Sequence, residues 1–586
     1  MILAITSLFK FNIQNTAQYI SLFFGLATLP LTYLLSCRFN FDTVTNKQKI
    51  SAITFNLIPV FLLSVTGAFS YWSVSGMETS LFVFLVLLGI YFNIENSSND
   101  KINLKFVSTF MLASLTRPEG FFFFALILLY TFITSRQYSV KRNNTLKELY
   151  IFLIPYTLYL SLRLIYYGYP FPNTFYAKAG FTDFYFLRGI AYFTDFTAAY
   201  LLYGVMLLLP FILLRVQKVR GRISLLMIII YIYIVSMIII GGDVLPMHRF
   251  FLPILPLIYI LFGKSLEYFY TSYNKNNLIK KNILLFIVVF IAATGFINLK
   301  NEETKLNLMY RTEIGLVAKM SVYGDWLKER QEESSRPLTV AASTIGAISY
   351  YSEMRLIDLL GLTDEYIAHN PKELTGLKEA APSTWRERHY NADYVLDQKP
   401  DYIIFPAGAK PSGFPESAVF VNDRFPTEYY IQLIYSHELG QMLPVFTRRN
   451  ERQIAKMEAV LDTISCDEKF VPYYIHANNL FLEYIRQKDS VYINRILSLY
   501  DEAKQLCPKR KNDFLTLIGM IEYHSGNLDE AAKAFNTVVE NDDMNSIAHF
   551  YLKNIYSQMK DTTGTIYHLR KLKSYSPFSI PQLIAE

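Results

Sequence analysis

Long apolar segments recur from the start of the chain to residue 298 and then stop. A bilayer core about 30 Å thick needs roughly 20 apolar residues per helix, and ten segments reach or approach that length. We therefore predict ten membrane helices, two of them short, at residues 17–36, 51–69, 80–95, 105–116, 120–134, 148–166, 198–214, 223–240, 250–264 and 282–298.

Basic residues concentrate in every second connection between these helices, for example at Arg136, Lys141, Arg142 and Lys147. The positive-inside rule places such connections in the cytoplasm. The alternate connections, and everything after residue 298, are then expected outside the cytoplasm. Those external connections are residues 70–79, 117–119, 167–197 and 241–249.

The short apolar run Met1–Phe9 ends at Lys10 and is too short to span a bilayer. It also lacks the basic start and cleavage site of a signal peptide. We expect a helix that lies on the outer membrane surface. On this assignment the first span already runs inward, which implies either an external amino terminus or missing upstream sequence.

A soluble α/β domain is expected at residues 299–465. Short β-rich apolar runs alternate there with helix-prone stretches such as 314–330, and these runs occupy residues 338–350, 355–360 and 401–406.

Residues 466–586 have the pattern of paired helices. With a 34-residue period, two units match the spacing of a tetratricopeptide repeat, at Tyr523, Gly526, Ala531 and Phe535 and then at Leu552, Tyr556, Leu569 and Pro577. A weaker unit precedes them, at Tyr500, Ala503 and Pro508. The alternative is an amphipathic helical tail without repeat identity, and both readings predict a packing or docking surface.

Composition agrees with this division of the chain. Charged residues make up 18% of the 586 residues, against about 25% in soluble proteins. Residues 1–298 hold 23 Lys and Arg against 10 Asp and Glu, whereas the remainder holds 33 against 39. This pattern excludes a plain soluble enzyme, a disordered chain and a disulfide scaffold. The net charge of +7 averages two opposite halves and does not indicate nucleic-acid binding.

Cys466 and Cys507 both fall in the external part and can pair in an oxidising compartment.

The external connections carry the polar residues that could act on a substrate, since charges near lipid are costly unless they pair or line a wet cavity. Glu78 precedes a membrane helix, where it could equally cap that helix. Arg117 and Glu119 lie in a tight turn, TRPEG, and could simply pair with each other.

Two more external connections add aromatic and basic groups. The stretch 168–178 contains Asn173, Tyr176 and Lys178, whose rings could stack on sugars or belong to an interfacial belt. In GGDVLPMHR, the glycines permit close backbone approach, Asp243 can act as a base or hydroxyl acceptor, and His248 and Arg249 offer cations to a phosphate. For each connection alone, an ordinary loop is the alternative.

Carboxylates and cations at the outer membrane boundary suit a substrate that is part lipid and part sugar phosphate. Glycosyl transfer needs one carboxylate to deprotonate the acceptor hydroxyl and cations to stabilise the leaving phosphate. Transport is the rival function, but transporters place their polar groups at the bilayer midplane.

Five motifs, in order, resemble one family of membrane proteins: SGMETSLF, LTRPEG, PNTFYAK, GGDVLPMHRFFLP and IDLLGLTD. The family is the GT-C group that includes the mycobacterial terminal β-(1→2)-arabinofuranosyltransferase and related bacterial motor-control membrane proteins, and the resemblance covers roughly residues 1–410. It implies a GT-C-like fold in the bacterial inner membrane, a polyprenyl-phosphate sugar donor, a pentofuranose being one candidate sugar, and an extracytoplasmic envelope glycan as acceptor. The residues that match its motifs are Glu78, Arg117, Glu119, Asn173, Tyr176, Lys178, Asp243, Arg249, Asp358 and Asp364.

One departure bears on activity. The family's catalytic acid lies in a first external loop that follows a first membrane helix, and the motifs of that loop are not found here. We therefore expect a late start codon or a degenerate gene copy, and no catalytic residue is assigned.

The resulting hypothesis is a polytopic α-helical glycosyltransferase with a membrane domain at 1–298, an external α/β domain at 299–465 and tetratricopeptide-like repeats at 466–586. A non-catalytic envelope assembly or motor-control protein, which uses the repeats to hold a protein partner, is the alternative. Membrane lipid is an expected partner and nucleic acid is not. No metal ligand cluster is predicted, and the need for a divalent metal stays open.

Overall fold

The computed structural model describes residues 2–40, 49–96, 101–135, 139–178, 183–243, 245–272, 277–374, 376–377, 389–461 and 464–577. The chain divides into two compact units. Unit 1 comprises residues 1–170 and 180–310, and unit 2 comprises residues 171–179 and 311–586.

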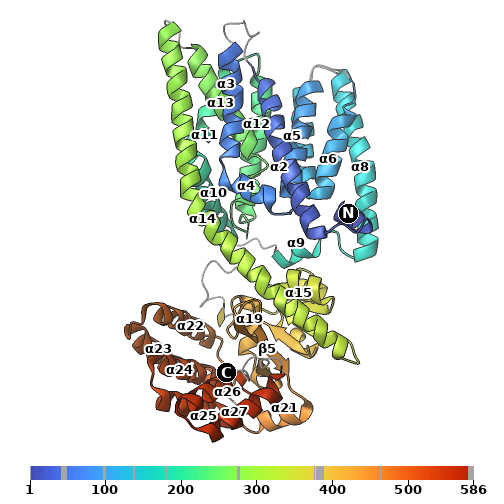
Figure 1. The fold of residues 1–586 in the computed structure, drawn as a ribbon. Coiled ribbons are helices and arrows are strands. Elements are labelled where there is room, and N and C mark those ends of the chain that lie inside the picture. Colours follow the sequence, from blue (N-terminus) through green and yellow to red (C-terminus); the bar gives the residue numbers. More distant parts are fainter. Residues whose placement is uncertain are drawn as a thin grey trace. The chain divides into compact units, whose positions relative to one another are not determined.

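Unit 1 is a bundle of helices (Figure 1). Its helices are α1 (Ile2–Leu8), α2 (Ile13–Cys37), α3 (Lys49–Ser64), α4 (Gly67–Val74), α5 (Thr79–Glu95), α6 (Leu104–Thr116), α7 (Glu119–Thr134), α8 (Ser139–Tyr167), α10 (Asp183–Tyr200), α11 (Val205–Leu208), α12 (Arg220–Ile239), α13 (Leu255–Ser272) and the first part of α14 (Asn277–Glu333). Short 3₁₀ turns cover η2 (Leu202–Gly204), η3 (Leu209–Arg215) and η4 (Arg249–Phe251).

The chain is a multi-pass membrane protein. Among the described residues, four helices are long and apolar enough to cross a bilayer, or up to six if each of two bent pairs is one span. Their outer faces expose large apolar side chains, such as Leu158, Leu162 and Ile165 on α8. Exposed apolar surface of this extent is costly in water and is covered by lipid in a membrane. The shorter apolar helices are α5, α6 and α7. The count of ten spans stays a prediction.

Two breaks change the expected helix boundaries. The predicted helix 51–69 is a pair, α3 and α4, bent by 63°. The backbone N–H of Gly67, freed by the bend, donates to Glu302 Oε2 at 2.6 Å, and a Cβ at Gly67 would lie 2.4 Å from that oxygen. The predicted helix 198–214 instead contains a 104° bend, where Tyr203 (φ 54°) and Gly204 (φ 91°) are left-handed.

A polar cluster lies at one end of the unit 1 bundle. The buried Lys264 Nζ donates to Glu267, Asn40 and Asn56, each at 2.7 Å. Buried charge is tolerated when it is paired and hydrogen-bonded in this way. These residues flank the connections that the charge pattern assigns to the cytoplasm.

Unit 2 contains a five-stranded sheet, shown at the centre of its ribbon in Figure 1. The strand order is β2-β1-β3-β5-β4, with β1 parallel to β2 and β3, and β5 antiparallel to β3 and β4. Val340 of β1 pairs with Leu356 of β2 and Tyr402 of β3. The strands are β1 (Thr339–Ala342), β2 (Arg355–Asp358), β3 (Tyr402–Ile404), β4 (Tyr429–Ser436) and β5 (Gln441–Arg448).

Unit 2 also contains several short helices that precede its terminal helix pairs. They are α9 (Asn173–Lys178), α15 (Ile345–Ser352), α16 (Glu365–His369), α18 (Ala392–Asp397), α19 (Phe414–Val421), α20 (Phe425–Glu428) and α21 (Glu451–Glu458).

The helix predicted to end at residue 298 continues to Glu333 as α14. Its last part, in unit 2, is held by an apolar contact with the sheet, where Met320, Tyr323 and Leu327 are buried with Val340 and other strand residues. The Tyr323 hydroxyl also donates to the Pro444 carbonyl at 2.8 Å. Packing of this face explains why the separately predicted helix 314–330 is part of one longer helix.

Antiparallel helix pairs form the end of unit 2: α22 (Phe470–Gln487) with α23 (Val491–Ala503), α24 (Lys511–Ser525) with α25 (Leu528–Asn541), and α26 (Ser546–Gln558) with α27 (Thr562–Tyr575). The short turn η5 (Pro508–Arg510) precedes α24. A disulfide joins Cys466 to Cys507, which confirms that the two sulfurs can pair. Gly526 ends α24 at φ +86°, and Ala531 and Phe535 are buried against Ala548 and Leu552.

Candidate functional site

Three of the four candidate connections meet at one end of unit 1. Glu78 is the residue before α5, Arg117 ends α6, and Glu119 begins α7. Arg117 contacts Glu119 at 2.9 Å and Glu78 at 3.8 Å. The ion pair that was the structural alternative for TRPEG is therefore present, and Arg117 also contacts Glu78 from a different connection.

The turn between α6 and α7 is tight because of Gly120. Its N–H donates to the Arg117 carbonyl at 2.9 Å, and a Cβ at Gly120 would lie 2.4 Å from the backbone nitrogen of Ser114. Glycine is thus required for the two helices to approach here. The turn holds Arg117 and Glu119 in place.

Glu78 differs from the other carboxylates of this cluster. It occupies the N-cap position of α5, but its side chain makes no capping hydrogen bond. Its side chain is 40% exposed, against 23% for Glu119 and 3% for Asp243. Glu78 is the carboxylate most available to a ligand.

Asp243 and Arg249 form a buried bidentate pair. Arg249 Nε donates to Asp243 Oδ2 at 2.8 Å, and Nη2 donates to Oδ1 at 3.1 Å. Such fork-like pairing fixes the guanidinium in one plane. The third nitrogen, Nη1, lies 3.7 Å from the sulfur of Met77, next to Glu78 in the chain.

Aromatic rings connect the two arginines. Phe250 lies 5.2 Å from the Arg117 guanidinium and 5.3 Å from that of Arg249. Arg249 also lies over Trp72 at 5.3 Å. Cations over ring faces are stabilised while keeping some N–H groups available, so the motifs of three connections form one cluster.

The glycines of the 241–249 connection allow helix α10 to pack against it. Cβ atoms at Gly241 and Gly242 would lie 2.9 Å from Tyr185 and 2.5 Å from Tyr192. The Tyr192 hydroxyl accepts the Phe250 N–H at 3.3 Å.

His248 is buried among aromatic rings of α10. It has a left-handed backbone (φ 47°), contacts Tyr192, Phe196 and Tyr200, and its Nδ1 has no hydrogen-bond partner among the described residues.

Asn173 and Tyr176 belong to unit 2. The Asn173 amide donates to the carbonyls of Gly361 at 2.8 Å and Asp364 at 3.1 Å, and the Tyr176 ring contacts His369 at 4.3 Å. Lys178 ends α9, but its side chain lies outside the described part of the chain.

The two aspartates of IDLLGLTD organise the loop that receives Asn173. Asp358 accepts the N–H groups of Leu360 at 3.0 Å and Thr363 at 2.8 Å. Burial raises the pKa of Asp358, and these hydrogen bonds oppose that rise. Asp364 caps α16 by accepting the Ile367 N–H at 3.1 Å. Both aspartates therefore have structural partners in unit 2.

Sequence reasoning missed Trp72, Tyr192 and Phe250. Phe250 directly follows Arg249, and an aromatic residue next to an arginine was an available signal. Trp72 lies three residues before the motif SGMETSLF, which contains no arginine. Tyr192 lies in the middle of α10 and carries no such signal.

In the described part of the chain, no group of three His, Cys, Asp or Glu side chains is arranged to hold a metal ion.

Comparisons with known proteins give limited matches. The profile of a domain of unknown function (DUF8728) matches residues 307–452. No curated protein matches the sequence. The solved structure of ArnT from Cupriavidus metallidurans bound to undecaprenyl phosphate is similar over 74% of this chain and 84% of that chain, with 11% sequence identity and a TM-score of 0.42.

Proposed function

We propose that the chain is a GT-C-type membrane glycosyltransferase that moves a sugar from a polyprenyl-phosphate donor to a cell-envelope glycan. The observation that carries this proposal is the cluster of Glu78, Arg117, Glu119, Asp243 and Arg249 at one end of unit 1. The order of the motifs that supply these residues adds support from the sequence.

In this reaction the acceptor hydroxyl attacks the anomeric carbon and the bond from that carbon to the phosphate oxygen breaks. Arg117 and Arg249 would stabilise the negative charge that develops on the leaving phosphate. Glu78 would accept the hydroxyl proton, because Glu119 and Asp243 are more buried and accept hydrogen bonds from arginines, whereas Arg117 lies 3.8 Å from Glu78.

We place this cluster and unit 2 on the extracytoplasmic side of a bacterial inner membrane. The disulfide between Cys466 and Cys507 supports that side, since such bonds persist in oxidising compartments. The tetratricopeptide identity of residues 466–586 is also proposed, and the left-handed Gly526 and the buried Ala531 and Phe535 support it.

A non-catalytic envelope protein is the second candidate. The observation that favours it is that every carboxylate of the cluster contacts a guanidinium, as in ion pairs that only stabilise a fold. Such a protein would use the helix pairs of residues 470–575 to bind a partner.

The test gives the purified full chain a radiolabelled polyprenyl-phosphate pentose or hexose together with envelope glycan, with and without EDTA. We expect transfer that Glu78→Gln lowers by at least 100-fold. Glu95→Gln is the matched control, because Glu95 is 41% exposed and also contacts an arginine, Arg38. Equal transfer by both variants would refute the role of Glu78, and no transfer by the unaltered chain would favour the second candidate. Loss of transfer in EDTA would show a need for a divalent metal.

A further inference from the structure

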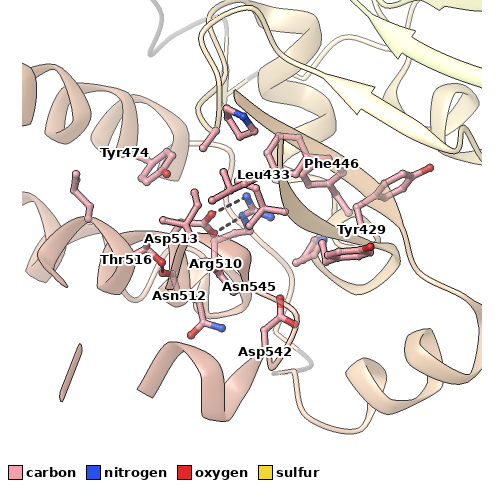
Figure 2. Close-up of a pocket in the computed structure, with 18 of the residues that line it drawn as sticks. Tyr429, Leu433, Phe446, Tyr474, Arg510, Asn512, Asp513, Thr516, Asp542 and Asn545 are labelled. Atoms are coloured by element: carbon pink, nitrogen blue, oxygen red, sulfur yellow. Dashed lines mark hydrogen bonds and ion pairs between the residues drawn. The ribbon is translucent and has the colours of Figure 1, made fainter. Parts of the chain in front are cut away.

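A cavity of about 290 Å³ lies within unit 2, between the strands β4 and β5 and the helix pairs (Figure 2). It is far in sequence from the cluster in unit 1. Its volume is just below the range of about 300–1,000 Å³ for small-molecule pockets, which suits a small ligand such as one or two sugar rings.

One wall of the cavity is apolar and largely aromatic. Tyr429 and Leu433 of β4 and Phe446 of β5 lie together on this wall in Figure 2. Tyr474 of α22 adds another ring. Flat rings of this kind pack against the C–H face of a sugar.

The opposite wall presents amide groups with unused donors. Asn512 Oδ1 accepts from Asn541 at 3.0 Å, and Asn545 Oδ1 accepts the Ala548 N–H at 3.0 Å. Each amide oxygen is thus fixed, while neither Nδ2 donates a hydrogen bond to any residue that the structure describes. Both NH₂ groups are oriented and available to ligand hydroxyls.

The charges beside these amides are compensated. Asp513 contacts Arg510 at 2.9 Å, and Asp542 contacts Arg449 at 2.7 Å. Both arginines are buried, and the Arg510 guanidinium also lies 3.6 Å from the ring centre of Phe420. Lys509, the other cation that lines the cavity, contacts Asp423 at 3.3 Å. Because these cations and carboxylates are already paired, the cavity favours a neutral ligand over an ion.

We infer that this cavity binds a neutral saccharide, with a ring face against the aromatic wall and hydroxyls bonded to Asn512, Asn545 and Asp542. A free sugar has both an apolar face and a hydrogen-bonding edge, as the two walls do. The inference does not depend on transfer by unit 1, because the binding residues all lie in unit 2.

The variants Asn512→Asp and Asn545→Asp test this site. Aspartate keeps the oxygen that accepts from Asn541 or caps α26, and it removes the NH₂ donor. Asn494→Asp is the matched control, because it makes the same charge change at an exposed position of α23 outside the cavity.

The full chain is purified in a detergent without a sugar head group, since an alkyl maltoside would compete. Saturation-transfer NMR then measures binding of methyl furanosides and pyranosides of arabinose, galactose, glucose, mannose and N-acetylglucosamine, with short uncharged peptides as the other ligand class. Thermal unfolding of each variant checks that it is folded.

We expect saturation of one or more glycosides, strongest at ring C–H protons, and at least a tenfold loss of affinity in each cavity variant. Asn494→Asp keeps the affinity of the unaltered chain. If one cavity variant does not fold, the glycoside affinity of the other variant decides the test. The inference is overturned if the glycosides give no signal, if the cavity variants leave it unchanged, or if only the peptides bind.

Discussion

We predict that acid destabilises the last helix hairpin of unit 2, because two buried histidines face each other there. His549 of α26 and His568 of α27 are both buried, and their Nδ1 atoms are 2.8 Å apart. His549 Nε2 lies 2.8 Å from the Asp543 carbonyl oxygen, so Nε2 carries the proton. In the neutral pair His568 Nδ1–H therefore donates to His549 Nδ1, and a further proton on His549 would place two N–H groups against each other.

Burial lowers the pKa of both rings, that of His568 to about 4 from 6.5. Asp543 favours the charged forms, whereas Lys571 opposes them. A folded-state pKa below the unfolded value means that the unfolded hairpin binds more protons, so its stability is complete above pH 6.5 and falls as the pH approaches 4. For His568 alone, the loss between pH 7.5 and pH 5 is about 2 kcal/mol, or about 30-fold in the opening equilibrium.

Hydrogen exchange of the full chain in detergent, with intrinsic rates corrected for pH, measures this opening in peptides that cover residues 543–577. We expect protection to fall by about 30-fold at pH 5. The variant His568→Asn keeps a donor toward His549 Nδ1 and removes one titrating group, so most of the pH dependence should disappear. A change below threefold in the unaltered chain, or an undiminished pH dependence in the variant, would refute the reasoning.

Three further predictions concern other parts of the chain. Asp243→Asn leaves the buried Arg249 without its charge partner and should lower the free energy of unfolding by about 3 kcal/mol, seen as a lower melting temperature in detergent; an unchanged temperature would show that the pair is not needed for stability. Replacing Cys466 and Cys507 together by serine should cost about 2–4 kcal/mol, and a thiol assay of the unaltered chain should find both cysteines blocked. Gly526→Ala, at φ +86°, should cost about 1 kcal/mol by urea unfolding followed in the helix pairs, and a neutral effect would contradict the left-handed end of α24.

The sequence predicted where helices occur better than how long each one is. The apolar period identified α2, α5, α6, α7, α8 and α12, because those segments are bounded by basic or turn residues. It did not predict the break before Gly67, because the freed N–H finds its partner at the distant Glu302. It also did not predict the break at Tyr203, because nothing in the residue type signals the left-handed backbone there. It also ended α14 too early, because the helix continues through packing of Tyr323 and its neighbours on a sheet.

The sequence predicted only part of the candidate site, because some of its contacts also depend on residues far away in the chain. Topology alone brings Glu78, Arg117 and Asp243 to one end of the bundle, because each follows or precedes a helix that ends there. The hydrogen bonds of Asn173 could not be predicted from the sequence around it, because its amide donates to carbonyls 188 and 191 residues later in the chain. The buried position of His248 likewise depends on rings from α10.

The docking of Asn173 onto the carbonyl of Gly361 imposes an order on biosynthesis. These residues are 188 positions apart, and ribosomes add about 5–20 residues per second. Helix α9 therefore emerges about 10–40 s before its carbonyl partners exist. During that interval the helices that follow α9 insert into the membrane while the segment 171–179 is still without its final contacts. Unit 2 is therefore completed only after all of unit 1, which ends at residue 310, has been synthesised.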